Sequence, residues 1–355
     1  MDGPDIHLLA AGTHLPGPAL DTATLVRRFD LPAVWEQWID TYVGTQSRHF
    51  CVDIDTGEVR QTLADMGEAA AVRAMSAAGV RAEDVDLIVM GTATPDQLMP
   101  ATVNRIAERL GIDRVPSYQL QSGCTGAVQA LSVAHRMLRS GPERNALVLG
   151  AETSAKFFDP AADIRDRPPA EQINGLLFGD GAGALVLSKE PGPASAVLRD
   201  VHVELVGLGR EPGQILDWYG RTTGERRGMP VAEDYKAIEE TVPKLATQTF
   251  ERMLERLDWD ETDLDYLLPP QLSGRMTQRI TEGLDAPGAH EISCVAETGN
   301  TGNALPFFQV ERLLPRMAPG DRALAVSVES SKWIQAGFAL EKPVTPTPSR
   351  TEASE

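Results

Sequence analysis

Short apolar runs alternate along the middle of the chain with stretches in which apolar residues recur at helical spacing. The stretches predict helices over 65–78, 101–110 and 125–139, and the runs predict strands over 87–90, 117–120 and 146–149. A glycine or a Ser-Gly-Pro sequence follows each predicted helix, as expected where a helix ends. This alternation is typical of an α/β protein with mostly parallel sheets.

Three further segments have patterns of their own. Residues 159–175 carry prolines among charged residues, which predicts a surface loop. Residues 178–187 predict a tight glycine turn that leads into an apolar strand. After Glu341 the chain is mostly Pro, Thr, Ser and Glu, a composition that predicts a disordered tail.

The second half of the chain repeats the first at an offset of about 177 residues. Three pairs of segments match in the same order: 84–88 with 263–267, 122–126 with 298–302, and 146–152 with 323–329. Such an order predicts a duplicated βα unit. We therefore expect two related halves, residues 1–190 and 191–341, packed as one body and followed by a tail over 342–355. In this body Cys124 and Asn300 occupy equivalent turns between a strand and a helix.

Composition excludes several classes of function. The chain has 355 residues, 33 Lys and Arg against 51 Asp and Glu, and a formal net charge of −18. This charge repels nucleic acids and anionic membrane surfaces, so neither is an expected partner. The three cysteines, Cys51, Cys124 and Cys294, are too few and too scattered for a disulfide framework or a zinc site, so no metal is expected. They fit a reducing compartment, and the start of the chain lacks the pattern of a signal peptide, so a cytoplasmic protein is expected.

Cys124 is the most distinctive of these residues. It follows a predicted strand, has Gly123 and Gly126 beside it, and stands at the start of the predicted helix over 125–139. Backbone N–H groups and the positive end of the helix dipole lower the pKa of a thiol, so we expect a nucleophilic thiolate. The alternative is a buried structural cysteine, which is common. Asn300 at the matching turn can donate a hydrogen bond to a carbonyl or enolate, although an asparagine there is more often a helix cap.

Three motifs carry a resemblance to a known family. They are SGCTGA over 122–127, FGDGAG over 178–183 and GNT over 299–301. With these motifs in this order, the chain resembles the β-ketoacyl-acyl-carrier-protein synthase III family of the thiolase superfamily up to about Leu340. The resemblance aligns Cys124 with the cysteine that the family acylates and Asn300 with its catalytic asparagine.

The resemblance implies a thiolase fold, an α/β architecture in which two duplicated βα halves form a layered α-β-α-β-α body. It also implies a homodimer and a reaction in which an acyl group moves from coenzyme A or an acyl carrier protein onto the cysteine. It implies no cofactor besides these thioester carriers. Trp38 lies where the family stacks a tryptophan on coenzyme A, Arg275 where an arginine lies near the pantetheine and carrier protein, and Met99 where a residue often reaches the partner's acyl pocket.

One catalytic position departs from the family pattern. Where the family has a histidine after a strand, this chain has Pro270, within the run LPPQL over 268–272. None of the six histidines falls in this turn. The histidine and the asparagine together stabilise the enolate that forms when a malonyl thioester loses carbon dioxide, and proline has no donor for it. Loss of one such donor costs about 3 kcal/mol, so the sequence does not favour decarboxylative condensation.

A second departure is Glu329, because the family has glycines there that supply an N–H to the oxyanion. A carboxylate about 4 Å from that oxyanion would repel it by about 4 kcal/mol at a dielectric constant of about 20. Either the side chain points away, or Glu329 is a base that replaces the histidine. We favour the first interpretation because Glu152 ends the matching segment of the other half. Glu297 is another candidate base, although a solvated loop charge is the simpler interpretation.

Basic residues indicate where an acidic partner could bind. Arg221, Arg226, Arg227, Arg275 and Arg279 could receive a carrier protein or the phosphates of coenzyme A. A solvated face explains the same residues nearly as well.

These residues support three hypotheses for the function. The leading one is an acyltransferase of specialised, natural-product biosynthesis: Cys124 takes an acyl group from a carrier protein or coenzyme A and passes it to a hydroxyl, amine or thiol acceptor without decarboxylation. The second is a condensing enzyme that decarboxylates a malonyl thioester with a substitute donor. The third is a non-catalytic partner subunit, a pseudo-ketosynthase, although such a scaffold would not need Cys124 and Asn300.

Overall fold

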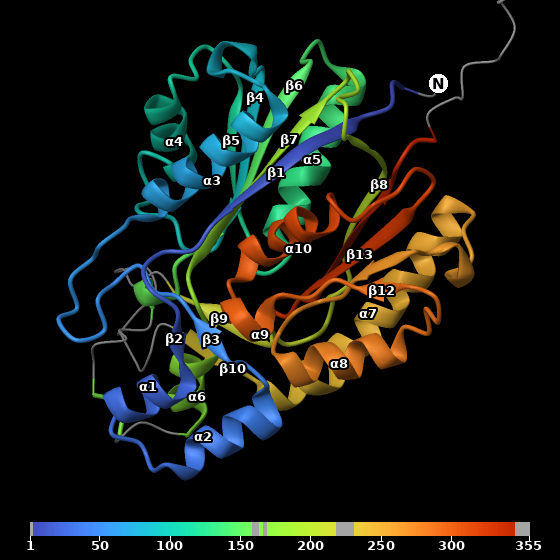
Figure 1. Cartoon of the computed structure of the whole chain (residues 1–355). Helices are drawn as coiled ribbons and strands as arrows, with labels where there is room; N and C mark the ends of the chain where they lie inside the picture. Colours follow the sequence, from blue (N-terminus) through green and yellow to red (C-terminus); the bar gives the residue numbers. More distant parts are fainter. Residues whose placement is uncertain (1–2, 158–162, 166–168, 218–230, 345–355) are drawn as a thin grey trace, which may run out of the picture.

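The computed structural model describes residues 3–157, 163–165, 169–217 and 231–344 (Figure 1). The expected tail beyond residue 344 lies outside these ranges, as do Arg221, Arg226 and Arg227. Among the described residues, no helix is long and apolar enough to cross a membrane, and no group of three or more His, Cys, Asp or Glu side chains could hold a metal ion.

The large sheet has ten strands, and its strand order repeats itself. The order is β5-β4-β6-β7-β1 in one half of the sheet and β12-β11-β13-β14-β8 in the other. The first half comprises β1 (His7–His14), β4 (Leu87–Thr92), β5 (Ser117–Gln121), β6 (Asn145–Glu152) and β7 (Gly181–Ser188). The second comprises β8 (Ala196–Leu205), β11 (Tyr266–Leu268), β12 (His290–Glu291), β13 (Arg322–Glu329) and β14 (Ile334–Glu341). The halves join where Leu8 of β1 pairs with Ala196 of β8, so the structure shows the duplication that the sequence predicts.

The prediction of mostly parallel sheets is wrong. β4 pairs in parallel with β5 and β6, and β11 pairs in parallel with β12 and β13. The other pairs of this sheet are antiparallel, in part because β7 and β14 each run back along the strand before them. β14 follows β13 after the short turn over 330–333, which leaves no room for a crossover helix. The sheet is therefore mixed.

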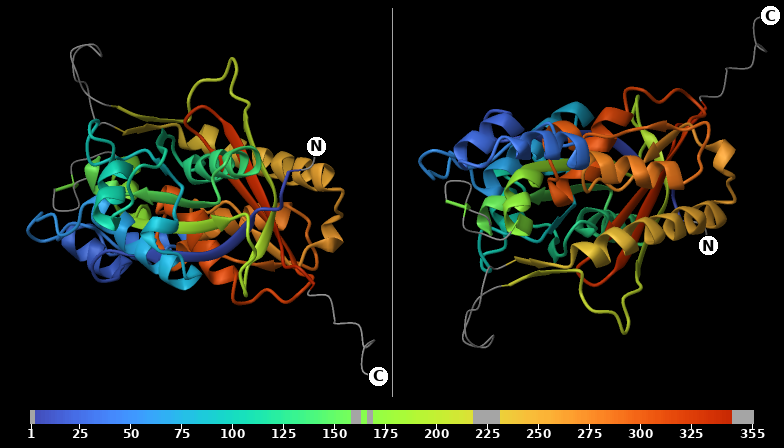
Figure 2. Two further views of the ribbon diagram at one scale, coloured as in Figure 1. Left: turned by 90° about the horizontal axis from the view of Figure 1, so that it is seen from above. Right: turned by 90° about the horizontal axis from the view of Figure 1, so that it is seen from below.

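Helices lie in three layers around the strands (Figures 1 and 2). α5 (Gly126–Ser140) and α10 (Leu305–Leu313) form the central layer, where their apolar residues share one core with strands of both halves. The outer helices are α3 (Leu63–Ala78) and α4 (Thr102–Leu110) on the first half, and α7 (Tyr235–Leu257) and α8 (Gly274–Gly283) on the second. This is the layered α-β-α-β-α body that the sequence predicts.

Strand residues alternate between the layers. In β4, Leu87 and Val89 pack against the central core, whereas Ile88 and Met90 pack toward α3 and α4. All four side chains are fully buried, which explains why the strand is a continuous apolar run without a polar face. Strands that are buried on both faces hold the loops at their ends in fixed positions.

The segment 159–175 is not wholly a loop. α6 (Pro169–Leu177) is a helix, so the loop prediction is wrong for this part of the segment. Proline is compatible with the first turn of a helix, because the N–H that it lacks would have no partner there.

Shorter elements gather at one end of the body, at the lower left of Figure 1. They are β2 (Leu20–Asp21), β3 (Ser47–Arg48), β9 (Gln214–Leu216), β10 (Val231–Glu233), α1 (Thr22–Arg28), α2 (Val34–Trp38), the π-helix η1 (Ile39–Val43) and α9 (Val295–Thr298). Leu25, Phe29, Ile39 and Leu176 belong to a separate apolar core among them. Short 3₁₀-helices complete the fold: η2 (Ala82–Asp84), η3 (Ser154–Lys156), η5 (Glu261–Asp263) and η6 (Gly302–Ala304). This end of the body contains the candidate site.

Candidate active site

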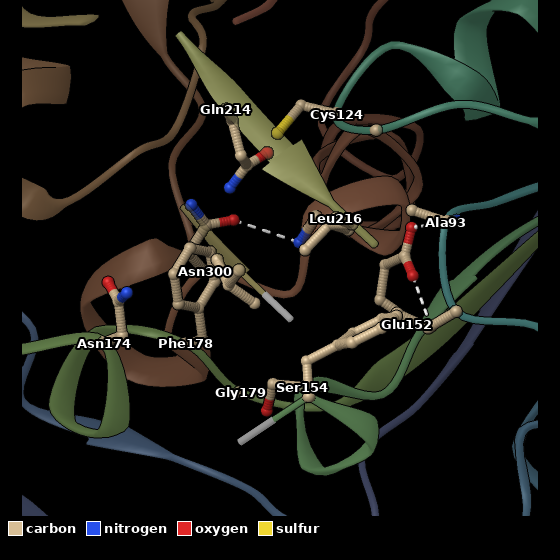
Figure 3. Close-up of a pocket in the computed structure, with 15 residues that line it drawn as sticks. Ala93, Cys124, Glu152, Ser154, Asn174, Phe178, Gly179, Gln214, Leu216 and Asn300 are labelled. Atoms are coloured by element: carbon tan, nitrogen blue, oxygen red, sulfur yellow. Dashed lines mark hydrogen bonds between the residues drawn. The ribbon is translucent and has the colours of Figure 1, made fainter. Parts of the chain in front are cut away.

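Cys124 and Asn300 lie together, although they belong to different halves of the chain. Cys124 precedes α5, and Asn300 lies between α9 and η6. Both residues line the same three cavities. Figure 3 shows the Cys124 sulfur and the amide groups of Asn300 and Gln214 pointing into one shared space. The structure thus brings together the two residues that the repeated turns single out.

Close backbone packing holds the turn at the start of α5. β4 passes so near that a Cβ atom added to Gly91 would lie 2.2 Å from the carbonyl carbon of Gly126, so only glycine permits this approach. The Asn303 side chain accepts a hydrogen bond from the Ala127 N–H at 2.7 Å and donates one to the Ser122 carbonyl at 3.0 Å. The second half of the chain therefore holds the nucleophile turn from both sides.

The backbone and side chain of Asn300 are held as firmly. Its N–H donates to the Leu177 carbonyl at 3.0 Å, and its carbonyl accepts a hydrogen bond from the Gly179 N–H at 3.1 Å. Its side-chain oxygen accepts a hydrogen bond from the Gly302 N–H at 3.0 Å, and its amide nitrogen donates to the Leu272 carbonyl at 3.3 Å. An amide nitrogen carries two hydrogens, so the second one remains for a substrate oxygen.

The first cavity is apolar and has a volume of about 100 Å³. Besides Cys124 and Asn300, its walls include Phe157, Phe178 and Leu216. Apolar walls of this kind bind hydrocarbon and exclude water. The cavity at the Cys124 sulfur is therefore suited to an apolar group.

The widest of the three cavities has a volume of about 430 Å³ and includes both Cys124 and, at its mouth, Trp38 and Arg275. Trp38 is 38% exposed, and its ring centroid lies 5.7 Å from those of Trp35 and Tyr42. Arg275 stands on the exposed side of α8. A partly exposed aromatic face beside a guanidinium suits the base and phosphates of coenzyme A.

Met99 does not join this site within a single chain. Its side chain is 86% exposed, and it is not among the described residues that line the three cavities at Cys124. Its contact with the acyl pocket of a partner subunit stays a prediction.

Pro270 lies in the smallest of the three cavities, of about 30 Å³, together with Cys124 and Asn300. The resemblance places the family's histidine at this position. All six histidines are among the described residues, and none of them lines any of the three cavities. The space can hold about one water molecule. The site therefore has the thiol and the amide but no imidazole.

The predicted thiolate is wrong for the free protein. Burial, followed by the charges of Glu329, Glu152 and Glu233, raises the pKa of the Cys124 thiol to about 12. The prediction considered the helix dipole, which contributes only about 0.3–1 kcal/mol, or less than one pKa unit. It could not consider three acids that the fold brings from other elements. Cys124 is therefore a neutral thiol before a substrate arrives.

Glu329 ends β13 and is buried behind the turn at Cys124. Its carboxylate accepts hydrogen bonds from the hydroxyl groups of Ser122 and Thr125, both at 2.6 Å, and from the hydroxyl group of Ser331. It is not among the described residues that line the three cavities. The carboxylate thus holds the turn and points away from the substrate space, which is the interpretation that the sequence favours.

Glu152 ends β6 and lines the apolar cavity (Figure 3). Its carboxylate accepts hydrogen bonds from the Ala93 N–H at 2.8 Å and the Thr92 hydroxyl at 3.3 Å, and also from the side chains of Thr94 and Asn303. Burial raises the pKa of Glu152 to about 7, although these hydrogen bonds act in the opposite direction. The apolar cavity therefore contains a carboxyl group whose pKa is raised toward neutral pH.

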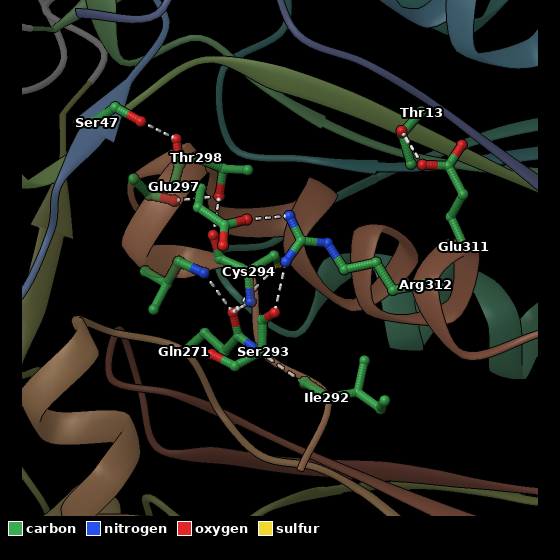
Figure 4. A network of polar contacts seen from close by, with 12 residues as sticks. Thr13, Ser47, Gln271, Ile292, Ser293, Cys294, Glu297, Thr298, Glu311 and Arg312 are labelled. Carbon is green, nitrogen blue, oxygen red and sulfur yellow. Dashed lines mark hydrogen bonds and ion pairs between the residues drawn. The ribbon is translucent and has the colours of Figure 1, made fainter. Parts of the chain in front are cut away.

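Glu297 is a surface charge. Its side chain is 60% exposed and pairs with Arg312 in the network drawn in Figure 4. In the same network the Gln271 side chain accepts a hydrogen bond from the Cys294 N–H at 2.8 Å, which anchors the start of α9 and so the loop of Asn300. This placement agrees with the simpler interpretation of Glu297 as a solvated loop charge.

Sequence reasoning missed four polar residues at the site: Gln214, Glu233, Tyr235 and Asn174. Each lines the apolar or the wide cavity, and both cavities include Cys124. Gln214 and Glu233 come together because they are opposite each other in the pairing of β9 with β10. Asn174 lies in the segment that the sequence predicts as a loop. The short alternating runs QIL and VAE could have indicated two strands, but not which cavity these strands line.

Comparisons with known proteins agree with these features. Residues 118–204 match the family model for 3-oxoacyl-[acyl-carrier-protein (ACP)] synthase III. A β-ketoacyl-[acyl-carrier-protein] synthase III from Rhodospirillum centenum is 34% identical over 297 residues, which cover 84% of this chain and 86% of that protein.

Solved structures share the fold. One described as AbyA1, a tetronic acid condensing enzyme, is 56% identical with a TM-score of 0.91, and the match covers 95% of this chain and 99% of that chain. The priming β-ketosynthase from the R1128 polyketide biosynthetic pathway is 26% identical with a TM-score of 0.78, over 97% of this chain and 98% of that chain. The predicted fold with two duplicated halves is thereby confirmed.

Proposed function

The chain belongs to the β-ketoacyl-[acyl-carrier-protein] synthase III family, and from this premise we propose that it joins two acyl thioesters without releasing carbon dioxide. Cys124 takes one acyl group from an acyl carrier protein or coenzyme A, and a hydroxyl group on the second acyl chain receives it. One observation carries the proposal: Cys124 and Asn300 share a cavity with Pro270, which stands where an imidazole would be.

The acylation step needs no imidazole. The sulfur of Cys124 attacks the thioester carbonyl of the donor, a new C–S bond forms, and the C–S bond to the carrier breaks. The proton of the Cys124 thiol leaves with the carrier thiol, so one neutral thiol replaces another. The Asn300 amide and backbone N–H groups are the donors for the oxyanion that forms on the way.

The relative described as a tetronic acid condensing enzyme supports a hydroxyl acceptor over an amine or a thiol. A tetronic acid is a cyclic ester, so its assembly from acyl thioesters requires one new C–O bond and one new C–C bond. In our proposal Cys124 carries a 3-oxoacyl group, and the acceptor is a 2-hydroxyacyl thioester. This relative and the polyketide ketosynthase also support a role in natural-product biosynthesis.

The two bonds form in sequence. The hydroxyl oxygen attacks the acyl carbon on Cys124, forms the ester and releases the thiol. The carbon between the two carbonyl groups of the 3-oxoacyl part then attacks the thioester carbonyl of the 2-hydroxyacyl part, closes the ring and releases the second thiol. Both neighbouring carbonyls stabilise the anion of that carbon, so no carboxyl group has to be lost to generate it.

The remaining features favour this function over the two alternatives. Pro270 speaks against an enzyme that decarboxylates a malonyl thioester, and the cavities at Cys124 speak against a non-catalytic scaffold. Trp38 and Arg275 support a coenzyme A or carrier-protein donor. The proposed reaction needs no metal and no further cofactor, and the proposal retains a homodimer in which Met99 reaches the partner subunit.

Intact-mass measurement tests the proposal. The wild-type protein should gain the mass of the acyl group when it is mixed with a 3-oxoacyl thioester, and Cys124→Ala should not. Addition of a 2-hydroxyacyl thioester should then remove the adduct. A wild-type protein that never gains the acyl mass would contradict the covalent scheme.

A further inference from the structure

Four polar side chains beside Cys124 form a connected set, here named the polar wall: Gln214, Glu233, Tyr235 and Asn174. The Gln214 amide donates a hydrogen bond to one oxygen of the Glu233 carboxylate at 2.6 Å. The Tyr235 hydroxyl lies 2.6 Å from the other oxygen of Glu233 and 2.5 Å from the side-chain oxygen of Asn174. The carboxylate is thus held from both sides.

The polar wall lies between the two larger cavities. Gln214 lines both of them, Asn174 lines the apolar cavity, and Glu233 and Tyr235 line the wide cavity. Figure 3 shows the Gln214 amide directed into the same space as the Cys124 sulfur. An acceptor in the wide cavity therefore lies in the space that the Glu233 carboxylate and the Cys124 sulfur share.

Protein groups already occupy the hydrogen-bond acceptor positions of two other carboxylates near the sulfur. Glu152 accepts hydrogen bonds from four groups, and so does Glu329. A carboxylate offers about four acceptor positions. Among the described residues, Glu233 accepts hydrogen bonds from Gln214 and Tyr235 alone, so it retains positions for the hydroxyl group of a substrate.

Resting on the proposed function, we propose that Glu233 is the base that takes the proton from the acceptor hydroxyl, and that Gln214 and Tyr235 position its carboxylate. The substrate class that this wall recognises is an acyl thioester with a hydroxyl group close to its carbonyl. An acceptor without that hydroxyl has neither the proton nor the oxygen that the step requires.

Atoms and electrons balance in this step. The hydroxyl proton moves to the Glu233 carboxylate while the hydroxyl oxygen forms a C–O bond to the acyl carbon on Cys124. The C–S bond breaks, and the protonated Glu233 returns the proton to the sulfur. The sulfur accepts it readily because burial and the nearby carboxylates raise the pKa of Cys124 to about 12. Glu233 is a carboxylate again at the end of the turnover.

Glu233→Gln in the full-length protein tests the inference. The variant should still gain the acyl mass on Cys124, because the thiol proton passes to the carrier thiol in that step and Glu233 does not take it, but transfer to a 2-hydroxyacyl thioester should slow by about 10²- to 10⁴-fold.

Tyr235→Phe tests the positioning role separately. The variant keeps the ring but loses the hydroxyl group that lies 2.6 Å from the Glu233 carboxylate. Transfer to the 2-hydroxyacyl thioester should therefore slow, while acylation of Cys124 stays unchanged. A merely structural role for Tyr235 would slow both steps alike.

Glu240→Gln is the matched control, because Glu240 is exposed on α7 and should affect neither step. Transfer by Glu233→Gln at the wild-type rate would overturn the inference and leave the proposed function intact. A wild-type protein that takes up no acyl group would overturn the proposed function instead. If Glu233→Gln fails to fold, Tyr235→Phe still decides, and transfer by this variant at the wild-type rate would overturn the inference.

Discussion

Glu152 and Glu329 occupy equivalent positions in the two halves, and each of them binds across to the other half. Each ends a strand, β6 or β13, and each is buried. Glu329 belongs to the second half but accepts hydrogen bonds from Ser122 and Thr125 of the first. Glu152 belongs to the first half but accepts one from Asn303 of the second. The duplication has therefore produced two halves that hold each other's turns.

The difference lies in what the two carboxylates face. Glu329 is enclosed behind the turn at Cys124, whereas Glu152 lines the apolar cavity, where burial raises its pKa to about 7. The same residue at the same strand end is a structural anchor in one half and an ionisable pocket wall in the other. An equivalent position in a duplicated fold thus determines where a side chain lies, and its surroundings determine what it does.

Removal of the Glu329 carboxylate should have the largest effect, which is a loss of folding stability. Glu329→Ala removes the shared partner of buried hydroxyl groups on Ser122 and Thr125, and a hydrogen bond to a charged group contributes about 1.5–3 kcal/mol. We expect the free energy of unfolding to fall by at least about 3 kcal/mol in chemical denaturation. The control is Glu297→Ala, whose exposed pair with Arg312 should contribute at most about 1 kcal/mol. Equal losses in the two variants would show that Glu329 is no anchor.

The contribution of Glu152 to folding stability should depend on pH. The pKa of Glu152 rises from its ordinary 4.5 to about 7 on folding, so the folded protein binds this proton more tightly than the unfolded chain. That contribution to stability is fully present below the unfolded pKa and is lost as pH rises through the folded pKa, by about 3 kcal/mol in total. Glu152→Gln should lack this loss.

The measurement is the free energy of unfolding of the wild type and of Glu152→Gln from about pH 5 to about pH 8. The difference between the two proteins isolates the titration of Glu152, because other groups contribute equally to both. A difference that stays constant over this range would mean that Glu152 does not titrate in the folded pocket.

Local patterns and the internal repeat were sufficient to predict β4, α5 and β6 and to place Cys124 and Asn300 at one site. The family resemblance added Trp38 and Arg275, and both line the wide cavity. The ionisation of Cys124 was not predictable in this way. It depends first on burial and then on the charges of acids from three other elements, and both follow from the folded chain rather than from the local sequence.

The sequence did not predict the polar wall, for a related reason. Gln214 and Glu233 flank a long stretch of chain, and their contact depends on the pairing of β9 with β10 rather than on any local periodicity. Likewise, prolines and charges around Asn174 predict a loop, whereas α6 begins at one of those prolines.

Pro270→His should give this site part of the decarboxylating activity that it lacks. An imidazole beside Asn300 adds a donor for the enolate, so the release of carbon dioxide from a malonyl thioester should rise by about 10²-fold. Pro270→Ala serves as the control, because it opens the same space without adding a donor. If both variants release carbon dioxide equally slowly, the missing imidazole is not what distinguishes this site.

Trp38→Ala should have the smallest effect of these changes. Loss of stacking, worth about 0.5–1.5 kcal/mol, should raise KM for a coenzyme A thioester by about tenfold at most and leave kcat unchanged. Val34→Ala on the same helix removes an exposed side chain that lines none of the cavities at Cys124, and it should change neither constant. A fall in kcat would place Trp38 in the reaction rather than in donor binding.

The number of carbon atoms in the product tests the central claim most directly. In a single turnover with one 3-oxoacyl thioester and one 2-hydroxyacyl thioester, every carbon of the two acyl groups should be retained, and the mass of the product should be that of the two acyl groups less the two hydrogens that leave with the thiols. Two carrier thiols should appear for each product. Two acyl groups that are recovered unjoined, or a product that forms equally well with Cys124→Ala, would contradict the account.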